Sequence, residues 1–252
     1  MKTLVLLLAI ILIYIAKGHR VRFHHSRIDV KYSWSGPRVN LVKYPLYMFA
    51  KHTVFTLKPG DCLYIPSKWW HWVFSLDENI AINVWFDGND HRNLSHDLPF
   101  RRTNTNYAQT KLNRVELQQK LKNIYPCGYR NVPNTYSYRR PTEAYSNVQQ
   151  RVSLDTFSDF LEKKLNYPYG TFYGENIDDE LNLSEYVDIL PNSGNISTNL
   201  WYYDGKSNSG LHNDESDNYL FQFMGYKKIF LFHPEHGKYL YADTILENAL
   251  RF

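Results

Sequence analysis

His212 and Asp214 are the residues whose type and spacing most directly suggest chemistry, within the sequence SGLHNDESDNYLFQFMGYKKIFLF at residues 209–232. In an extended strand, side chains alternate between two faces, so these two residues point the same way and Asn213 points away. One imidazole and one carboxylate on a single face supply two of the three ligands of a 2-His-1-carboxylate site for non-haem Fe(II). The stretch therefore predicts a metal site that still lacks one histidine.

A second histidine in a β-rich setting lies far upstream, at His71. It belongs to the sequence LKPGDCLYIPSKWWHWVFSLDENIAINVWF at residues 57–86. Pro59-Gly60 fits a type II turn between two strands. Residues 80–86 predict a further strand, in which Asn83 lies on the face opposite Ile82.

The composition is that of a globular, β-rich protein. Hydrophobic residues make up 43% of the 252 residues, and the high number of tyrosines, 21, favours β-structure. The net charge of +4 is too small to indicate nucleic acid as a partner. The two cysteines, Cys62 and Cys127, do not form a disulfide framework, and Cys62 is expected to be a buried structural thiol.

Residues 1–27 are predicted to form an N-terminal hydrophobic segment. Residues 4–16 are an unbroken apolar run, which is short for a full membrane span and suits a short anchor or a signal-peptide core. The basic residues that follow favour retention of the bulk of the protein on the cytosolic side. We therefore expect a membrane-associated protein with a single N-terminal anchor; the alternative is a secreted or lumenal protein after signal cleavage.

The remainder of the chain divides into three segments and predicts a mainly β fold with some α. Residues 28–86 are predicted to be β-rich, and residues 87–150 to be a linker with one helix near 108–124. Residues 151–252 are expected to begin with a helix over 151–165. Short strands are then predicted at TFYG, EYVDIL and NLWYYDG, before the stretch that carries the first motif.

The two motif-bearing blocks resemble the two halves of the JmjC/cupin-like 2-oxoglutarate dioxygenases, closest to the asparaginyl hydroxylases of the factor-inhibiting-HIF type. The later block resembles the front half, with the HxD motif at 212–214, Asn218, and Gly225-Tyr226-Lys227 before a hydrophobic strand that ends in Pro234. The earlier block resembles the back half, with PGD, IP and WWH followed by Asn83 on the last strand. The resemblance implies a double-stranded β-helix, that is, a cupin or jelly-roll barrel.

The resemblance also implies which side chains hold the metal. His212, Asp214 and His71 would bind Fe(II) as a facial triad that leaves open positions for 2-oxoglutarate and O₂.

Four further residues are implied in binding 2-oxoglutarate. Lys227 would pair with its distal carboxylate, and Ser209 lies where the family often has a threonine that helps hold this carboxylate. Asn218 and Asn83 would donate hydrogen bonds near the metal-bound end of the co-substrate. A lysine on a buried strand needs an anionic partner in any case, because an unpaired buried ammonium is costly.

The implied function is that of an Fe(II)/2-oxoglutarate-dependent dioxygenase, an oxidoreductase that hydroxylates a protein side chain, with a protein or peptide as its substrate. Two rivals belong to other classes. A non-catalytic cupin-like binding or scaffold protein, degenerate or split and anchored to a membrane, predicts no Fe(II) binding and no succinate formation. A metal-dependent cupin of another chemistry, such as an isomerase, would have no use for Lys227.

The two halves occur in the reverse of the family's order, since His71 precedes His212. Circular permutation would explain this order if residues 87–150 bridge the old termini. Alternatively, the chain is a fragment whose barrel forms only between copies, as a homo-oligomer, or the site has decayed and does not close. The separation of the two histidines decides the question, because ligands of one metal lie within a few ångströms of each other.

Overall fold

A computed structural model describes residues 23–26, 28, 30–33, 36–86, 98–110, 114–122, 126–130, 171–175, 181–190, 196–205 and 207–242. Its strands are β1 (Phe23–His25), β2 (Val30–Ser33), β3 (Gly36–Val39), β4 (Thr53–Leu57), β5 (Asp61–Ile65), β6 (Trp70–Ser75), β7 (Glu78–Phe86), β8 (Phe100–Thr103), β9 (Pro126–Arg130), β10 (Thr171–Glu175), β11 (Ile196–Asp204), β12 (Ser207–Asp214), β13 (Asp217–Met224) and β14 (Lys227–Phe232). Its helices are η1 (Pro45–Phe49), α2 (Thr105–Thr110), α3 (Arg114–Leu121), η5 (Leu183–Glu185) and η6 (Pro234–Tyr239), of which the three marked η are 3₁₀-helices.

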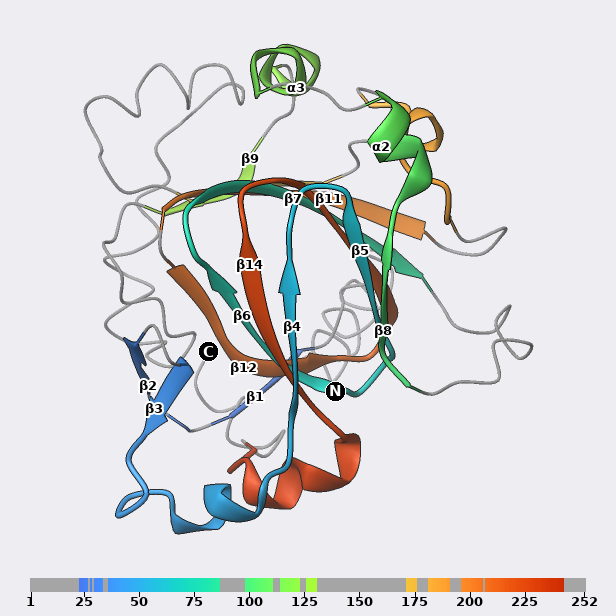
Figure 1. The fold of residues 1–252 in the computed structure, drawn as a ribbon. Helices are drawn as coiled ribbons and strands as arrows, with labels where there is room; N and C mark the ends of the chain where they lie inside the picture. The colour runs from blue at the N-terminus through green and yellow to red at the C-terminus, as the bar shows by residue number, and fades with distance from the viewer. Residues whose placement is uncertain are drawn as a thin grey trace, which may run out of the picture.

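Two antiparallel sheets face each other and curve into a barrel (Figure 1). One sheet has the strand order β1-β12-β6-β14-β4, and the other has the order β8-β5-β13-β7-β11-β10-β9. Strands β2 and β3 form a separate hairpin. The prediction of a mainly β, cupin-type barrel with few helices is confirmed.

Strands from two distant parts of the chain alternate within both sheets. In the first sheet, β12 and β14 come from the later part and flank β6, while β4 from the earlier part pairs with β14. In the second sheet, β13 lies between β5 and β7, and β11 follows β7. Residues 53–86 and 196–232 therefore build one barrel within a single chain, as the permutation hypothesis requires.

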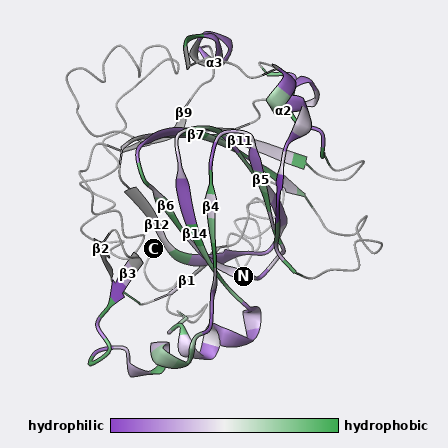
Figure 2. Cartoon of the chain, viewed as in Figure 1, coloured by the Kyte–Doolittle hydropathy of each residue, from purple (hydrophilic) through white to green (hydrophobic). Residues whose placement is uncertain are grey.

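The period of two along the strands separates the barrel interior from two outer layers. On β7, Ile82 and Val84 join a hydrophobic cluster outside the second sheet, whereas Asn83 and Trp85 face the interior. This outer cluster is covered by Tyr107 of α2 and by the segment that contains η5. Figure 2 shows that the strands of both sheets carry hydrophobic as well as hydrophilic residues.

A second cluster covers the outer face of the five-stranded sheet. It contains Trp72, Phe74 and Phe232, and residues around η1 and after η6 pack onto it. A third cluster, which includes Leu220 and Leu231, fills the barrel interior. Each fully buried aliphatic or aromatic side chain contributes about 1.5–3 kcal/mol, so all three clusters stabilise the barrel.

The connection between β4 and β5 has the predicted turn. Gly60 has φ +91°, as the second central residue of a type II turn requires. Cys62 follows directly and is fully buried, and burial raises the pKa of its thiol, as expected for a structural cysteine.

The predicted strand EYVDIL is wrong. The chain instead forms η5 and a turn, in which Leu183, Tyr186 and Val187 are buried at helical rather than alternating spacing. Side-chain amides of Asn104 and Asn106 donate to the carbonyls of Tyr186 and Val187, which a strand would have used in its ladder.

The helix expected near residues 108–124 is present as two short helices, α2 and α3, of which α2 begins earlier than expected. The helix predicted over 151–165 and nearly all of the hydrophobic N-terminal segment lie outside the described residues. Within the part of the chain that the structure describes, no helix is long and apolar enough to cross a membrane.

Candidate metal centre

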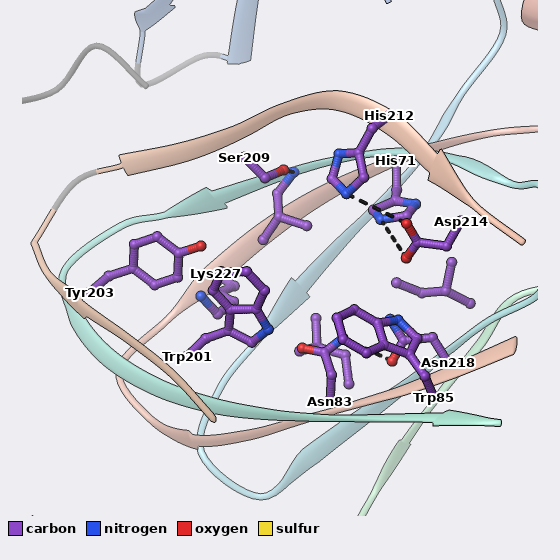
Figure 3. Close-up of a pocket in the computed structure, with 13 residues that line it drawn as sticks. His71, Asn83, Trp85, Trp201, Tyr203, Ser209, His212, Asp214, Asn218 and Lys227 are labelled. Atoms are coloured by element: carbon purple, nitrogen blue, oxygen red, sulfur yellow. Dashed lines mark hydrogen bonds and ion pairs between the residues drawn. The ribbon is translucent and has the colours of Figure 1, made fainter. Parts of the chain in front are cut away.

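His71 and His212 face each other across two neighbouring strands. They are directly opposite in the pairing of β6 with β12, and the centroids of their rings are 4.2 Å apart. Asp214 lies two residues further along β12 on the same face (Figure 3). Its carboxylate oxygens lie 3.6 Å from Nε2 of His71 and 4.0 Å from Nε2 of His212. One potential ligand atom from each residue falls within 4.8 Å of the others.

Backbone carbonyls set the orientation of both imidazole rings. Nδ1 of His71 lies 3.0 Å from the carbonyl oxygen of Trp69, and Nδ1 of His212 lies 3.1 Å from that of Gly210. A carbonyl oxygen can only accept, so each Nδ1 donates a proton to its carbonyl, and in the neutral imidazole the lone pair is then on Nε2, on the side of Asp214. This is the arrangement that metal-binding histidines use to fix their tautomer.

A β-bulge in β12 brings Ser209 onto the same face as His212. The pairing with β6 shifts between Asn208 and Leu211, where β12 has one residue more than its partner. Gly210 has φ +73°, and the backbone N–H of Val73 donates to Oγ of Ser209 at 3.2 Å. In a regular strand, residues three apart would face opposite sides; the extra residue restores a common face.

The carboxylate of Asp214 is buried and incompletely satisfied. Its Oδ1 has no hydrogen-bond partner among the described residues. Burial raises the pKa of Asp214, and the neighbouring His71 and Trp85 oppose this rise. A divalent cation fits this donor set, because it would complete the carboxylate and accept both Nε2 lone pairs. Among the described residues, this is the one group of three metal-ligating side chains with ligand atoms this close.

Lys227 lies at the other end of the same pocket (Figure 3). The residue is only 1% exposed. Its Nζ donates to Oγ of Ser75 at 3.0 Å and lies 4.2 Å from the centroid of the Tyr203 ring. No carboxylate of the described residues lies within ion-pair distance of this ammonium, and burial lowers the pKa of Lys227 to about 7, with Asp77 opposing. A buried ammonium in this position calls for an anionic ligand.

The pocket between these two ends has about 510 Å³ of empty space, which includes the part that opens to solvent. Both sheets contribute to its lining, and the amide of Asn83 donates to the side-chain oxygen of Asn218 at 2.8 Å across neighbouring strands. Trp201 and Tyr203 are half-buried, and their rings are nearly parallel, with an interplanar angle of 11°.

All seven residues proposed from the sequence line this one pocket: His71, Asn83, Ser209, His212, Asp214, Asn218 and Lys227. Their ligand roles stay predictions. The hydroxyl of Ser209 is already used, since it donates to the carbonyl of Gly210 at 3.0 Å.

Three residues near Lys227 are not indicated by the sequence analysis. Trp201 and Tyr203 belong to a predicted strand to which no role is assigned, and no motif includes Ser75. The period of two does carry a signal for these residues. Residues 201 and 203 share one face of β11, and residues 73 and 75 share the face of β6 on which His71 lies.

A family model described as a cupin-like domain matches residues 10–93 and 89–249 of the chain. The similarity to individual curated proteins is more distant. Protein L887 of Acanthamoeba polyphaga mimivirus, whose name assigns it a JmjC domain, is 26% identical over 221 residues, which is 79% of this chain and 37% of that protein.

Two animal proteins match over shorter stretches. Jumonji C domain-containing protein 5 of Drosophila melanogaster is 43% identical over 44 residues, 18% of this chain and 11% of that protein. Lysine-specific demethylase 8 of Xenopus tropicalis is 36% identical over 61 residues, 24% of this chain and 12% of that protein. The chain thus spans little more than a third of the mimivirus protein and far less of the other two. No solved structure matches the chain.

Proposed function

Because the chain belongs to the cupin-like domain family, we propose that it is an Fe(II)/2-oxoglutarate-dependent oxygenase that hydroxylates a side chain of a protein or peptide. One observation carries the proposal. One pocket holds both the buried His71, His212 and Asp214 cluster and, at its other end, the buried ammonium of Lys227 with no carboxylate partner in the described part of the chain.

The histidines and the aspartate would hold Fe(II) with two neutral imidazoles and one carboxylate. When bound, Fe(II) and 2-oxoglutarate supply the activation of O₂ for hydroxylation of a C–H bond, and 2-oxoglutarate leaves as succinate and CO₂. The role of the protein is to bind the metal and 2-oxoglutarate and to orient them. The carbonyls of Trp69 and Gly210 accept from Nδ1 of the two rings and so orient both Nε2 atoms toward Asp214.

Lys227 would bind the distal carboxylate of 2-oxoglutarate. Ser75 and Tyr203 hold its Nζ at the pocket surface through a hydroxyl acceptor and a ring face, which leaves the charge available to a ligand. The charges of the filled pocket also balance. The two positive charges of the metal and the one of Lys227 offset the one negative charge of Asp214 and the two of 2-oxoglutarate, so that burial of the set is tolerable.

The amides of Asn83 and Asn218 lie between the two ends, where we propose that they donate to the metal-bound part of 2-oxoglutarate. The apolar walls of the pocket, which include Trp85, Leu220 and Ile65, would exclude water from the reacting atoms. The curated relatives support a protein substrate, because one is named a lysine-specific demethylase and others are named HSPB1-associated protein 1.

We further infer that the two halves of the barrel are circularly permuted relative to the family. The family model matches the chain in two segments rather than one. The strands of the two halves interleave within one chain, and Ser26 pairs with Ala242 and donates to the carbonyl of Leu240. The residue that directly follows β1 and the segment that follows η6 thus lie side by side, where a conventional member would have a continuous chain.

An anaerobic titration of the full chain with Fe(II) and 2-oxoglutarate, followed by a succinate assay in air, tests the proposal. We expect both ligands to bind and succinate to form. Metal binding should be lost in His71→Ala and in His212→Ala, which would show that both halves build one site. His233→Ala is the matched control, because His233 is exposed and lies outside the pocket.

Two results would contradict the proposal in different ways. Absence of metal and 2-oxoglutarate binding in the wild type would favour a non-catalytic cupin-like module. Metal binding without 2-oxoglutarate binding would favour another metal-dependent cupin chemistry.

A further inference from the structure

Large apolar residues are concentrated at the surface of one short segment around η1. Leu41, Val42, Leu46, Met48 and Phe49 are all exposed, and we call them the η1 face. Val42 is 95% exposed, Met48 67% and Phe49 57%. Single exposed apolar residues are ordinary, but five within residues 41–49 are typical of a surface that binds another protein or a membrane. Figure 2 shows hydrophobic residues along this segment at the lower end of the barrel.

The surroundings of the η1 face are basic. Residues 30–60 contain four lysines and one arginine and no aspartate or glutamate. Three of these cations, Arg38, Lys43 and Lys51, are exposed and flank the apolar residues. The adjoining η6 contributes one exposed acid, Glu235, which lies 3.8 Å from Nδ1 of His233.

The η1 face packs against residues 239–241, which follow η6 or end it. Phe49 contacts Tyr239, with ring centroids 5.9 Å apart, and the backbone N–H of Leu46 donates to the hydroxyl of Tyr241 at 3.0 Å. Between these two tyrosines, the carbonyl of Leu240 accepts a hydrogen bond from Ser26. The segment that directly follows β1 therefore lies beside the η1 face.

The sequence that precedes β1 is apolar and then basic. Residues 4–16 are an unbroken apolar run, and Lys17, Arg20 and Arg22 follow before β1 begins at Phe23. Two features thus occur at the same end of the folded domain. One is the exposed η1 face with its basic neighbours, and the other is β1, which an apolar and then basic sequence precedes.

We propose that the η1 face rests on an anionic lipid surface. Apolar side chains that enter the headgroup region, flanked by lysine and arginine, are the combination by which proteins bind membrane surfaces. A second copy of the chain fits this face less well. Two-fold pairing would bring Arg38, Lys43 and Lys51 of both copies together, with no acid in residues 30–60 to compensate. The proposal is independent of the chemistry in the pocket.

A fluorophore placed on the η1 face tests the proposal with the full chain. Val42→Cys in a Cys127→Ser background carries an environment-sensitive label, and Cys62 is too buried to react. Val115→Cys is the matched control, because Val115 is 73% exposed on α3, at the opposite end of the molecule in Figure 1. With vesicles of phosphatidylcholine and phosphatidylserine, we expect the emission at residue 42 to shift to the blue and that at residue 115 to stay unchanged.

The other occupants of the face give different results. Equal responses at residues 42 and 115 would overturn the proposal, since the apolar sequence at residues 4–16 alone would then explain any binding to vesicles. A concentration-dependent blue shift at residue 42 without vesicles would assign the face to a second copy, and a shift that is already complete in dilute protein would assign it to a segment of the same chain. No shift under any of these conditions would leave a protein partner as the occupant and would also overturn the proposal.

The charge of the lipid gives a second, quantitative test. Lys43→Gln and Lys51→Gln should each lower the ratio of lipid-contacting to free label at residue 42 about five-fold, whereas Lys120→Gln on α3 should have no effect. The same label with phosphatidylcholine alone should show a much smaller shift. A response that is independent of both the lysines and the anionic lipid would contradict an electrostatic contribution.

Discussion

The two ends of the pocket bury charge in different ways. At the metal end, formed by His71, His212 and Asp214, each imidazole has its own backbone carbonyl, so the ligand atoms are oriented before any metal arrives. At the lysine end, Lys227 has a hydroxyl and an aromatic ring but no described carboxylate within ion-pair distance. The side chains of the metal end are therefore oriented by the backbone, whereas the ammonium of the lysine end has no carboxylate partner among the described residues.

The difference predicts that the two ends respond differently to the same kind of substitution. Loss of a side chain at the metal end should abolish ligand binding with little change in the free protein. Loss of the charge at the lysine end should also weaken ligand binding, but it should stabilise the free protein, because an uncompensated buried ammonium is removed.

Lys227→Met is expected to have the largest effect. The distal carboxylate of 2-oxoglutarate would lose its buried charge partner at a cost of about 3–5 kcal/mol, or a 10²–10³-fold loss of affinity. The free energy of unfolding of the free protein should rise by about 1–4 kcal/mol. Calorimetric titration and urea unfolding measure the two effects. Lys228→Met, on the neighbouring position of β14, should change neither, and a destabilised Lys227→Met protein would refute the contrast between the two ends.

Asp214→Asn tests the metal end. Mn(II), used as a stand-in that resists oxidation, should stabilise the wild type by about 2.7 kcal/mol at a hundred-fold excess over its Kd, and this stabilisation should vanish in the variant. The unfolding free energy of the metal-free variant should stay within about 1 kcal/mol of the wild type, because the substitution keeps the volume of the side chain. Thermal unfolding with and without Mn(II) is the measurement. Retention of the Mn(II) effect would exclude Asp214 as a ligand.

The lysine end predicts an affinity for 2-oxoglutarate that falls as the pH rises. Burial lowers the pKa of Lys227 from 10.5 to about 7, with Asp77 as the one opposing charge and Tyr203 as the facing ring. Between these values the unfolded chain binds the proton that the free folded protein has lost, so the stability of the free protein rises with pH in this window. Binding of 2-oxoglutarate requires the charged form and should weaken by up to about ten-fold per pH unit above about 7. Lys227→Arg should flatten this profile; an equal slope in the variant would assign the dependence to another group.

Ser75→Ala gives the smallest expected effect. Without the hydroxyl acceptor, the charged form of Lys227 loses about 1 kcal/mol of stabilisation, which lowers its pKa further. The affinity for 2-oxoglutarate should therefore fall a few-fold at pH 8 and remain nearly unchanged at pH 6, where Lys227 stays charged. Thr53→Ala, at an exposed position of β4, is the control. A loss as large as that of Lys227→Met would mean that Ser75 contacts the ligand itself.

Local rules were sufficient where a side chain's direction depends only on its own strand. The common face of His212 and Asp214 and the split of Ile82 from Asn83 both follow from the period of two, and both are observed. The turn at Gly60 likewise depends on one residue's conformation.

Contacts between distant strands could not be obtained in this way. The pairing of His71 with His212 depends on the register of β6 with β12, which is set by all residues of both strands together. The surroundings of Lys227 come from β6 and β11, and no local pattern in β14 indicates them. The strand predicted at EYVDIL, residues 185–190, does not form, because the polar partners of its backbone, Asn104 and Asn106, come from another part of the chain.

The bulge at Gly210 has a consequence for how the site tolerates change in the chain. The bulge determines how the start of β12 is oriented relative to the HxD motif. One residue added to or removed from a strand exchanges the two faces on which all later side chains lie. Deletion of Gly210 would leave the composition of the site untouched and yet turn His212 and Asp214 toward the outer layer, or else Ser209 away from the pocket. The number of residues at this position, more than their identity, therefore keeps Ser209, His212 and Asp214 directed into the same pocket.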